Sequence, residues 1–313
     1  MSLSTLLTAK ISADPPCCVI STYEEMEAPA HLIPGSLAFL SASKNTMHKI
    51  KQSPDGENIR FISSDLHSKY QSLAVDFGPV NLGIVHRFCV TFAKKIARSD
   101  GRLIVYCFDQ TFQAQANASF LLGSLLVINF GWTPEKAAEP FVGASSPFKL
   151  RPFRDATFST RPYPLMLTEC LKGLAKSIKL GWFDWKTFDA QQYEELDSPY
   201  NGDVHQICPK FIAFKGPLAI GSHHREPNEV SFPPDHYAPL LLSLGVSSVV
   251  RLNDADTYAG AEFERAGLAH HDLFFTDCTV PPDAIVERFL GLCDAAPGAV
   301  AVHCRAGLGG RGR

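Results

Sequence analysis

Hydrophobic and polar positions follow strand and helix periods in two separate runs along the 313-residue chain. In the first run, apolar residues three or four positions apart predict amphipathic helices, and short apolar stretches predict buried strands. The helices are expected at Asn81–Ile96, at Ala114–Phe130, from Thr133 onward and at Tyr163–Leu180, and the strands within His31–Ala42, at Arg60–Ser63 and at Leu103–Cys107. The polar stretch Asn45–Asn58, which contains a Pro-Asp-Gly turn, is predicted to be a loop.

A polar, acidic stretch from Trp182 to Cys208 separates the two runs and contains a predicted short helix, Asp189–Leu196. The second run is expected to hold strands at Phe211–Phe214, Ser247–Leu252, His271–Phe275 and Ala299–His303, and helices at Pro234–Leu244, Ala261–Ala266 and Pro282–Ala295. This alternation predicts an α/β fold of two domains, each a mixed, mostly parallel sheet with flanking helices. We divide the chain into an irregular tail (1–27), an N-terminal domain (28–185), an acidic linker helix (186–207) and a C-terminal domain (208–313).

Composition and charge argue against several classes of protein, among them nucleic-acid-binding, membrane-spanning and disulfide-rich proteins. The formal net charge of −3 argues against nucleic-acid binding, which needs a basic surface. No apolar run of about 18 residues predicts a membrane span, and the N-terminus is a poor signal peptide, so we expect a protein of the cytoplasm and nucleus. The nine cysteines are scattered and form no Cys-x-x-Cys pair. Neither a disulfide framework nor a zinc site is supported, and no cofactor or metal is expected.

The strongest chemical signal lies at the end of the second run. The predicted strand Ala299–His303 delivers Cys304 to the carboxyl edge of a sheet, where open α/β sheets bind ligands. The glycine-rich loop that follows can curl its backbone N–H groups around a phosphate, and Arg311 offers a planar fork for phosphate oxygens. Such surroundings also lower the pKa of a cysteine, so that the thiolate of Cys304 can attack phosphorus.

Attack on a phosphoester also needs an acid for the leaving oxygen. Asp277 follows a predicted strand and lies 27 positions before Cys304, which leaves room for a loop, a helix and a strand that return to the same sheet edge. His303 is expected to hold the loop by bonding backbone groups. A buried cysteine beside glycine is more often structural, and a loop aspartate is more often a turn former. The combination of all these features favours a phosphatase.

The chain resembles the cell-division-cycle-fourteen family of dual-specificity protein phosphatases, of the mitotic-exit type. The resemblance rests on the blocks DFGPVNLGIVHRFC, ANASFLLGSLLVI, TPEKA, PFRDA, LTECLKGLAKSIKLGW, NGDVHQICPKFIAFKGP, SSVVRLN, AGLAHHDLFFTD and AVHCRAGLG, in this order. It implies two tandem phosphatase-like domains. The first lacks a catalytic cysteine, with a pseudo-loop at Cys107–Asn117, and the second is catalytic.

The same resemblance implies roles for individual residues. Cys304 corresponds to the nucleophile and Asp277 to the general acid. The phosphate loop corresponds to His303, Arg305, Ala306, Gly307, Leu308 and Gly309, with Arg311 as a further candidate. The implied substrates are phosphoproteins, with phosphoserine followed by proline and a basic residue further on, as in substrates of cyclin-dependent kinases. Glu194 and Glu195 are candidates for an acidic substrate groove, although a solvated helix face explains them equally well.

The loop departs from the family pattern at one place. The family has five residues between cysteine and arginine and then a hydroxyl residue, whereas six separate Cys304 from Arg311. We therefore expect a C-terminally truncated or frameshifted member with an incomplete second domain. The alternative function is an inactive phosphoprotein-binding pseudo-phosphatase. A lipid or RNA phosphatase is disfavoured by the acidic linker. The family also suggests the nucleolus, spindle pole or centrosome as locations.

Overall fold

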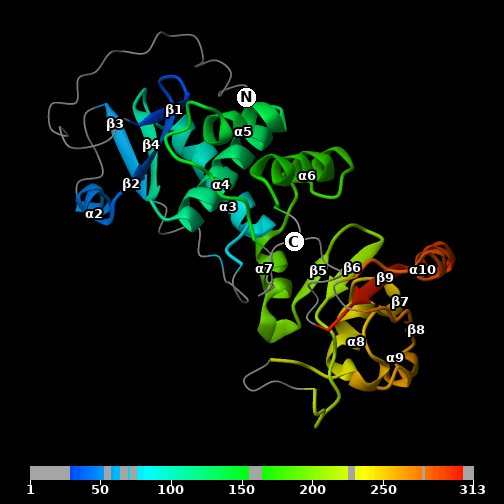
Figure 1. Ribbon diagram of the computed structural model, residues 1–313. Coiled ribbons are helices and arrows are strands. Elements are labelled where there is room, and N and C mark those ends of the chain that lie inside the picture. Colours follow the sequence, from blue (N-terminus) through cyan, green and yellow to red (C-terminus); the bar gives the residue numbers. More distant parts are fainter. Residues whose placement is uncertain are drawn as a thin grey trace. The chain divides into compact units, whose positions relative to one another are not determined.

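The computed structural model describes residues 29–52, 58–63, 70, 76–154, 164–224, 230–276 and 279–305. The chain forms two compact units, Met1–Ala190 and Gln191–Arg313, which are described separately (Figure 1). The helix α7, Ala190–Asp197, crosses this division and agrees with the helix predicted there. Within the described part of the chain, no helix combines the length and the apolar character that crossing a membrane requires.

Unit 1 is built on a four-stranded sheet in the order β1-β2-β4-β3. Its strands are β1 (Ala30–Ile33), β2 (Leu37–Ala42), β3 (Ile59–Ser63) and β4 (Leu103–Asp109). β1 is antiparallel to β2, while β2 and β3 are parallel to the central strand β4. The helices are α2 (Lys44–Gln52), α3 (Leu82–Ala97), α4 (Phe112–Phe130), α5 (Pro134–Val142) and α6 (Leu167–Lys179).

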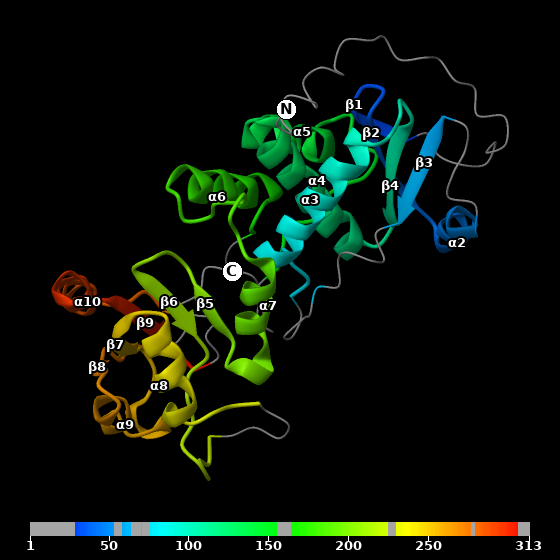
Figure 2. The same ribbon diagram turned by 180° about the vertical axis from the view of Figure 1, so that it is seen from behind.

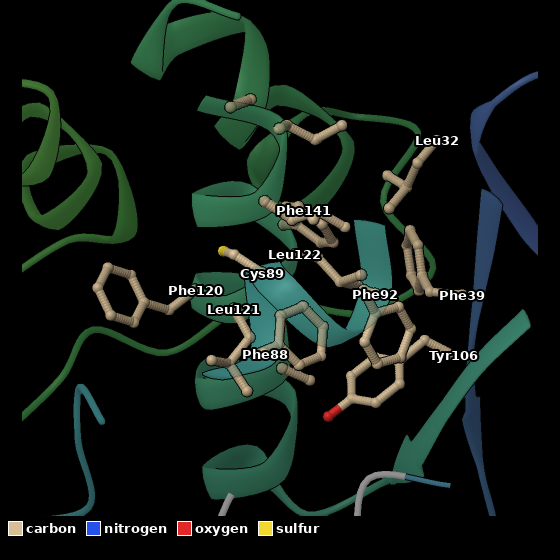
Figure 3. Packing of buried hydrophobic residues seen from close by; sticks show 14 of the residues in the cluster. Leu32, Phe39, Phe88, Cys89, Phe92, Tyr106, Phe120, Leu121, Leu122 and Phe141 are labelled. Carbon is tan, nitrogen blue, oxygen red and sulfur yellow. The ribbon is translucent and has the colours of Figure 1, made fainter. Parts of the chain in front are cut away.

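The two faces of this sheet are covered unequally. Alternate residues of β4 point to opposite faces, so Tyr106 joins the large core beneath α3, α4 and α5, while Val105 packs beneath the short α2. Figure 3 shows the larger core, where Phe88 and Phe92 stack at 4.2 Å between ring centroids and both meet the ring of Tyr106. Side chains of this size dominate the apolar area that a core removes from water.

Local sequence explains where these helices begin and end. Asn81 Oδ1 accepts a hydrogen bond from the backbone N–H of Ile84 and so caps α3. Thr111 caps α4, and Gly131, with φ of 67°, ends it. Thr133 caps α5, the helix expected from Thr133 onward, with Pro134 at its first position.

The predicted loop Asn45–Asn58 was wrong over its first half, where the chain forms the helix α2. Ser43 Oγ accepts from the N–H of Thr46 at 3.3 Å and caps this helix. Met47 and Ile50, three positions apart, are buried against the sheet. Two apolar residues among many polar ones are too few for a clear helical period, so tertiary packing decides this element.

Unit 2 contains a five-stranded sheet in the order β5-β6-β9-β7-β8. The strands are β5 (Val204–Gln206), β6 (Phe211–Phe214), β7 (Val246–Arg251), β8 (Ala269–Asp272) and β9 (Ala299–His303). β5 is antiparallel to β6, and the other pairs are parallel. The strand predicted at His271–Phe275 begins two residues earlier, because Ala269 pairs with Ser248 and Asp272 with Arg251.

Helices cover both faces of the second sheet (Figure 2). α8 (Pro234–Ser243) and α9 (Ala261–Arg265) share a core with Phe214, Val249 and Ala301. α10 (Asp283–Ala295) packs on the other face, beside Val250 and Val300. The α/β class with mostly parallel sheets is confirmed for both units.

The two units share one strand order, although no repeat is evident in their sequences. In each unit an antiparallel pair, β1-β2 or β5-β6, forms one edge of the sheet. The second strand of that pair lies parallel to the last strand of the unit, β4 or β9. That last strand also pairs in parallel with an earlier strand, β3 or β7. β1-β2-β4-β3 therefore corresponds to β5-β6-β9-β7, and β8 is an addition. By this correspondence, β4 is the counterpart of β9.

Candidate active site

Cys304 is the first residue beyond β9, the central strand of unit 2. β9 runs parallel to β6 and β7, with Val302 opposite Ala213 and His303 opposite Arg251. The three strands therefore end at one edge of the sheet, and Cys304 emerges between them, half-buried. This is the carboxyl edge at which open parallel sheets bind ligands.

Gly216 lets the backbone after β6 lie directly against the residues that follow β9. Its N–H donates to the carbonyl oxygen of Arg305 at 3.1 Å. A Cβ atom added at Gly216 would overlap the carbonyl oxygen of Cys304 and lie 3.0 Å from that of Arg305. A residue with a side chain could not take this place without moving the start of the loop.

His303 ties the carbonyl of Cys304 to a buried network. Its Nδ1 lies 3.0 Å from the Cys304 carbonyl oxygen, and its Nε2 lies 2.6 Å from the hydroxyl of Tyr258. A carbonyl only accepts, so Nδ1 carries the proton and, in a neutral ring, Nε2 accepts from Tyr258. The Tyr258 oxygen then accepts from Nε2–H of His270 at 2.9 Å. The network fixes one tautomer of each ring.

Burial keeps this network uncharged. It lowers the pKa of His303 to about 3, against the opposing effect of the hydrogen bond to Cys304. Burial also lowers the pKa of His270 and raises that of the Tyr258 phenol. At neutral pH both imidazoles are therefore neutral, which agrees with the proton positions derived from the hydrogen bonds.

The ion pair between Arg251 and Asp272 holds Tyr258 in place. Arg251 is 2% exposed and makes a bidentate pair with Asp272, at 2.6 Å from Nε to Oδ1 and 3.0 Å from Nη2 to Oδ2. Its Nη1 donates to the Tyr258 carbonyl at 2.6 Å, and its guanidinium lies 4.4 Å from the centre of the Tyr258 ring. Burial by itself raises the pKa of Asp272, but the bond to Arg251 and its charge hold this pKa below its usual range.

Arg305 is held by a neighbouring segment. Its Nη2 donates to the carbonyl oxygen of His224, and the ring of His224 contacts the carboxylate of Asp256 at 3.1 Å. Arg305 therefore leaves β9 in a defined direction.

The structure brings only some of the predicted site residues together. His303, Cys304 and Arg305 lie side by side at the sheet edge. Glu194 and Glu195 lie on α7, where Glu195 Oε1 accepts from the amide of Gln191. The other predicted site residues, Asp277, Ala306, Gly307, Leu308, Gly309 and Arg311, lie outside the described residues. The catalytic and phosphate-binding roles of all these residues stay predictions.

Sequence reasoning missed the residues that hold the backbone of Cys304 or the His303 network behind it. These are Gly216, Arg251, Tyr258, His270 and Asp272. Arg251 carried a usable signal, since it is a charged residue at the end of the apolar strand SSVVRL. Tyr258 carried none, because its partners come from distant elements.

The corresponding edge of unit 1 has a different chemistry. Cys107 lies inside β4, and its Sγ contacts the Val105 carbonyl at 3.7 Å. Burial raises the pKa of this thiol to about 12, so it remains protonated. The residue that follows β4 is Gln110, where unit 2 has Cys304. Among the described residues of unit 1, none places a thiolate at this edge.

Comparison with known proteins decides the family. Residues 31–177 match the family described as "Dual specificity protein phosphatase, N-terminal half". Human dual specificity protein phosphatase CDC14A is 41% identical over 263 residues, which cover 82% of this chain and 43% of the human protein. The chain belongs to the CDC14 family of dual-specificity phosphatases.

Other CDC14 relatives come from distant organisms. The tyrosine-protein phosphatase cdc-14 of Caenorhabditis elegans is 35% identical over 80% of this chain and 36% of its own length. The tyrosine-protein phosphatase CDC14 homologue of Schizosaccharomyces pombe is 30% identical over 84% of this chain and 50% of its own length. The family predicted from the sequence is confirmed, and the chain spans half or less of these three relatives.

Proposed function

We propose that this CDC14-family chain carries the active site of a cysteine-dependent protein phosphatase that acts on phosphorylated serine, threonine and tyrosine. The observation that supports it best is the position of Cys304 at the carboxyl edge of β9, with its carbonyl tied to His303. The relatives' names, dual specificity and tyrosine-protein phosphatase, agree with this reaction.

The bond from His303 also orients the start of the loop. In a trans peptide the C=O of one residue and the N–H of the next point in opposite directions. Because His303 Nδ1–H binds the Cys304 carbonyl, the N–H of Arg305 is turned to the opposite side of the peptide plane. This is the first of the N–H groups that we propose for the phosphate nest.

The proposed reaction has two steps. The Cys304 thiolate attacks phosphorus, the S–P bond forms, and the P–O bond to the substrate breaks as Asp277 gives its proton to the leaving oxygen. Water then attacks the phosphocysteine and gives a proton to Asp277. The S–P bond breaks, inorganic phosphate leaves and the thiolate returns.

For substrates, we propose phosphoserine-proline sites with a nearby basic residue, as in substrates of cyclin-dependent kinases. The supporting feature is α7, which fully buries none of its residues and leaves Glu195 exposed and Glu194 partly exposed. A cell-cycle role and a location in cytoplasm and nucleus remain part of this proposal.

A second candidate, phosphoprotein binding without turnover, rests on the six residues between Cys304 and Arg311. One extra residue moves a Cα atom by about 3.8 Å, which is enough to displace an arginine from a bidentate phosphate contact.

The test is hydrolysis of a phosphoserine-proline peptide with a lysine near its C-terminus. We expect turnover that vanadate inhibits, that Cys304→Ser abolishes and that Glu194→Gln with Glu195→Gln weakens through KM. Turnover that survives Cys304→Ser would refute the cysteine mechanism. Phosphopeptide binding without turnover in the parent protein would favour the second candidate.

A further inference from the structure

Two carboxylates and one imidazole converge in unit 2, away from Cys304 along the chain. Asp197 is the last residue of α7, Asp203 precedes β5, and His205 lies within β5. Nε2 of His205 is 3.0 Å from Oδ1 of Asp197 and 3.0 Å from Oδ1 of Asp203. The side chain of His205 is 11% exposed, that of Asp197 is 22% exposed and that of Asp203 is 14% exposed. The three ligand atoms all lie within 4.8 Å of one another.

We propose that Asp197, Asp203 and His205 bind one Zn²⁺ ion, which joins the end of α7 to β5. Around a tetrahedral zinc with bonds of about 2.0 Å, neighbouring ligand atoms are about 3.3 Å apart. The two separations from His205 Nε2, 3.0 Å each, lie close to that value, and the two carboxylate oxygens lie within 4.8 Å of each other, so small side-chain rotations suffice. A fourth position is left for water.

Charge favours a cation at this point. The Nε2 atom of His205 can carry only one proton, and it lies 3.0 Å from an oxygen of each of two carboxylates, which repel each other. Zinc in place of that proton meets two negative oxygens and one neutral nitrogen, so the charges sum to zero. An imidazole ligand together with only three protein ligands suits zinc better than Ca²⁺ or Mg²⁺, which take six or more oxygen ligands.

The backbone holds these ligands in place before any metal binds. Asp203 has φ of 54° and follows Gly202, whose φ is 102°, so the chain turns sharply back from α7 into β5. The Asp203 N–H donates to the Ser198 carbonyl at 3.0 Å, and its carbonyl accepts from Lys215 at 3.2 Å. The ring of Tyr193 packs edge-on to His205 at 6.0 Å between centroids. Little ordering remains to be done on binding.

A second group of possible ligands, His223, His224 and Asp256, provides the control. His223 and Asp256 are exposed, and His224 already contacts Asp256. The variant Asp256→Asn removes the carboxylate of that group and leaves the proposed site intact.

The experiment is a Zn²⁺ titration of the metal-free protein by calorimetry, with the melting temperature measured in parallel. We expect one tight equivalent and a raised melting temperature. His205→Gln and Asp203→Asn should each weaken this binding by at least about tenfold and remove the thermal shift, whereas Asp256→Asn should not. Asp203→Asn keeps a residue that tolerates positive φ, and Asp197→Asn at the helix end serves as the further variant if His205→Gln does not fold.

Cobalt substitution identifies the ligand atoms. Co²⁺ at the proposed site should show only the weak visible bands of nitrogen and oxygen ligands. An intense sulfur-to-cobalt band would place the metal on a cysteine and overturn the proposal. Absence of a tight equivalent in the parent protein, or equal loss of affinity in Asp256→Asn, would overturn it as well.

Discussion

The hydroxyl of Tyr258 lies 2.6 Å from Nε2 of His303 and 2.9 Å from Nε2 of His270. One phenol thus connects the short helical turn after β7, the strand β8 and the strand that carries Cys304. It holds the His303 ring, which in turn holds the Cys304 carbonyl. The backbone of Cys304 is therefore held in place by buried groups from three separate elements.

Removing this hydroxyl should loosen the network without leaving a large cavity. We expect Tyr258→Phe to lower the free energy of unfolding by about 1–3 kcal/mol, because the buried nitrogens of His303 and His270 lose their shared partner. Urea denaturation measures this change. Tyr200→Phe is the control, since Tyr200 is 75% exposed, and it should change stability by less than about 0.5 kcal/mol. Equal stability of the two variants would show that the network contributes nothing.

Acid should destabilise unit 2 through His303. Its pKa is lowered to about 3 in the folded protein, while an unfolded histidine titrates near pH ~6.5. Between these values the unfolded chain binds the additional proton, so this contribution to stability is complete above about pH 6.5 and is lost as the pH falls toward 3. Through this one group, the free energy of unfolding should change by at most about 1.4 kcal/mol per pH unit. His270, whose pKa is also lowered, acts in the same direction.

The pH effect is checked by denaturant unfolding at a series of pH values. His303→Gln removes the titrating group, so its stability should depend less steeply on pH between about 3 and 6.5 than that of the parent protein. Parallel curves for the two proteins would contradict the assignment of a neutral, buried His303.

A side chain at Gly216 should disturb the backbone around Cys304. We expect Gly216→Ala to cost about 1–3 kcal/mol of stability and to reduce the proposed phosphatase activity, because its Cβ would meet the Cys304 carbonyl. Gly291→Ala is the matched control within α10, where nothing lies within 4 Å of the added Cβ. That change should stabilise the helix by about 0.5–1 kcal/mol. If both variants behaved alike, the close approach at Gly216 would have no energetic meaning.

Arg251 should not be replaceable by lysine. Lys can supply the charge but not the two parallel N–H groups that meet Asp272 nor the third that meets the Tyr258 carbonyl. We expect Arg251→Lys to destabilise the protein by about 2 kcal/mol or more, as when a buried, bonded charge loses partners. Arg265→Lys, at the end of α9, is the comparison and should be nearly neutral. Thermal unfolding distinguishes them, and similar melting temperatures would refute the anchoring role.

Much of the fold could be predicted from the sequence because its apolar residues recur with a clear helical or strand period. The strand Ala299–His303 was predicted with its observed bounds, and the helix expected from Thr133 onward is α5, which Thr133 caps. α2 could not be read, because only Met47 and Ile50 mark its buried side. The position of Cys304 at a sheet edge followed from strand and loop order. The partners of Tyr258 did not, since they lie 12 and 45 positions away and meet it only through the strand pairing.

The connection between β4 and α4 in unit 1 is too short to form a phosphate-binding loop. Only Gln110 and Thr111 lie between β4 and α4, and the Thr111 N–H already bonds the Asp109 carboxylate at 2.8 Å. So few peptide groups cannot surround an anion. A cysteine introduced at Gln110 would therefore gain no phosphate loop around it, and giving this unit such a loop requires an insertion rather than a substitution.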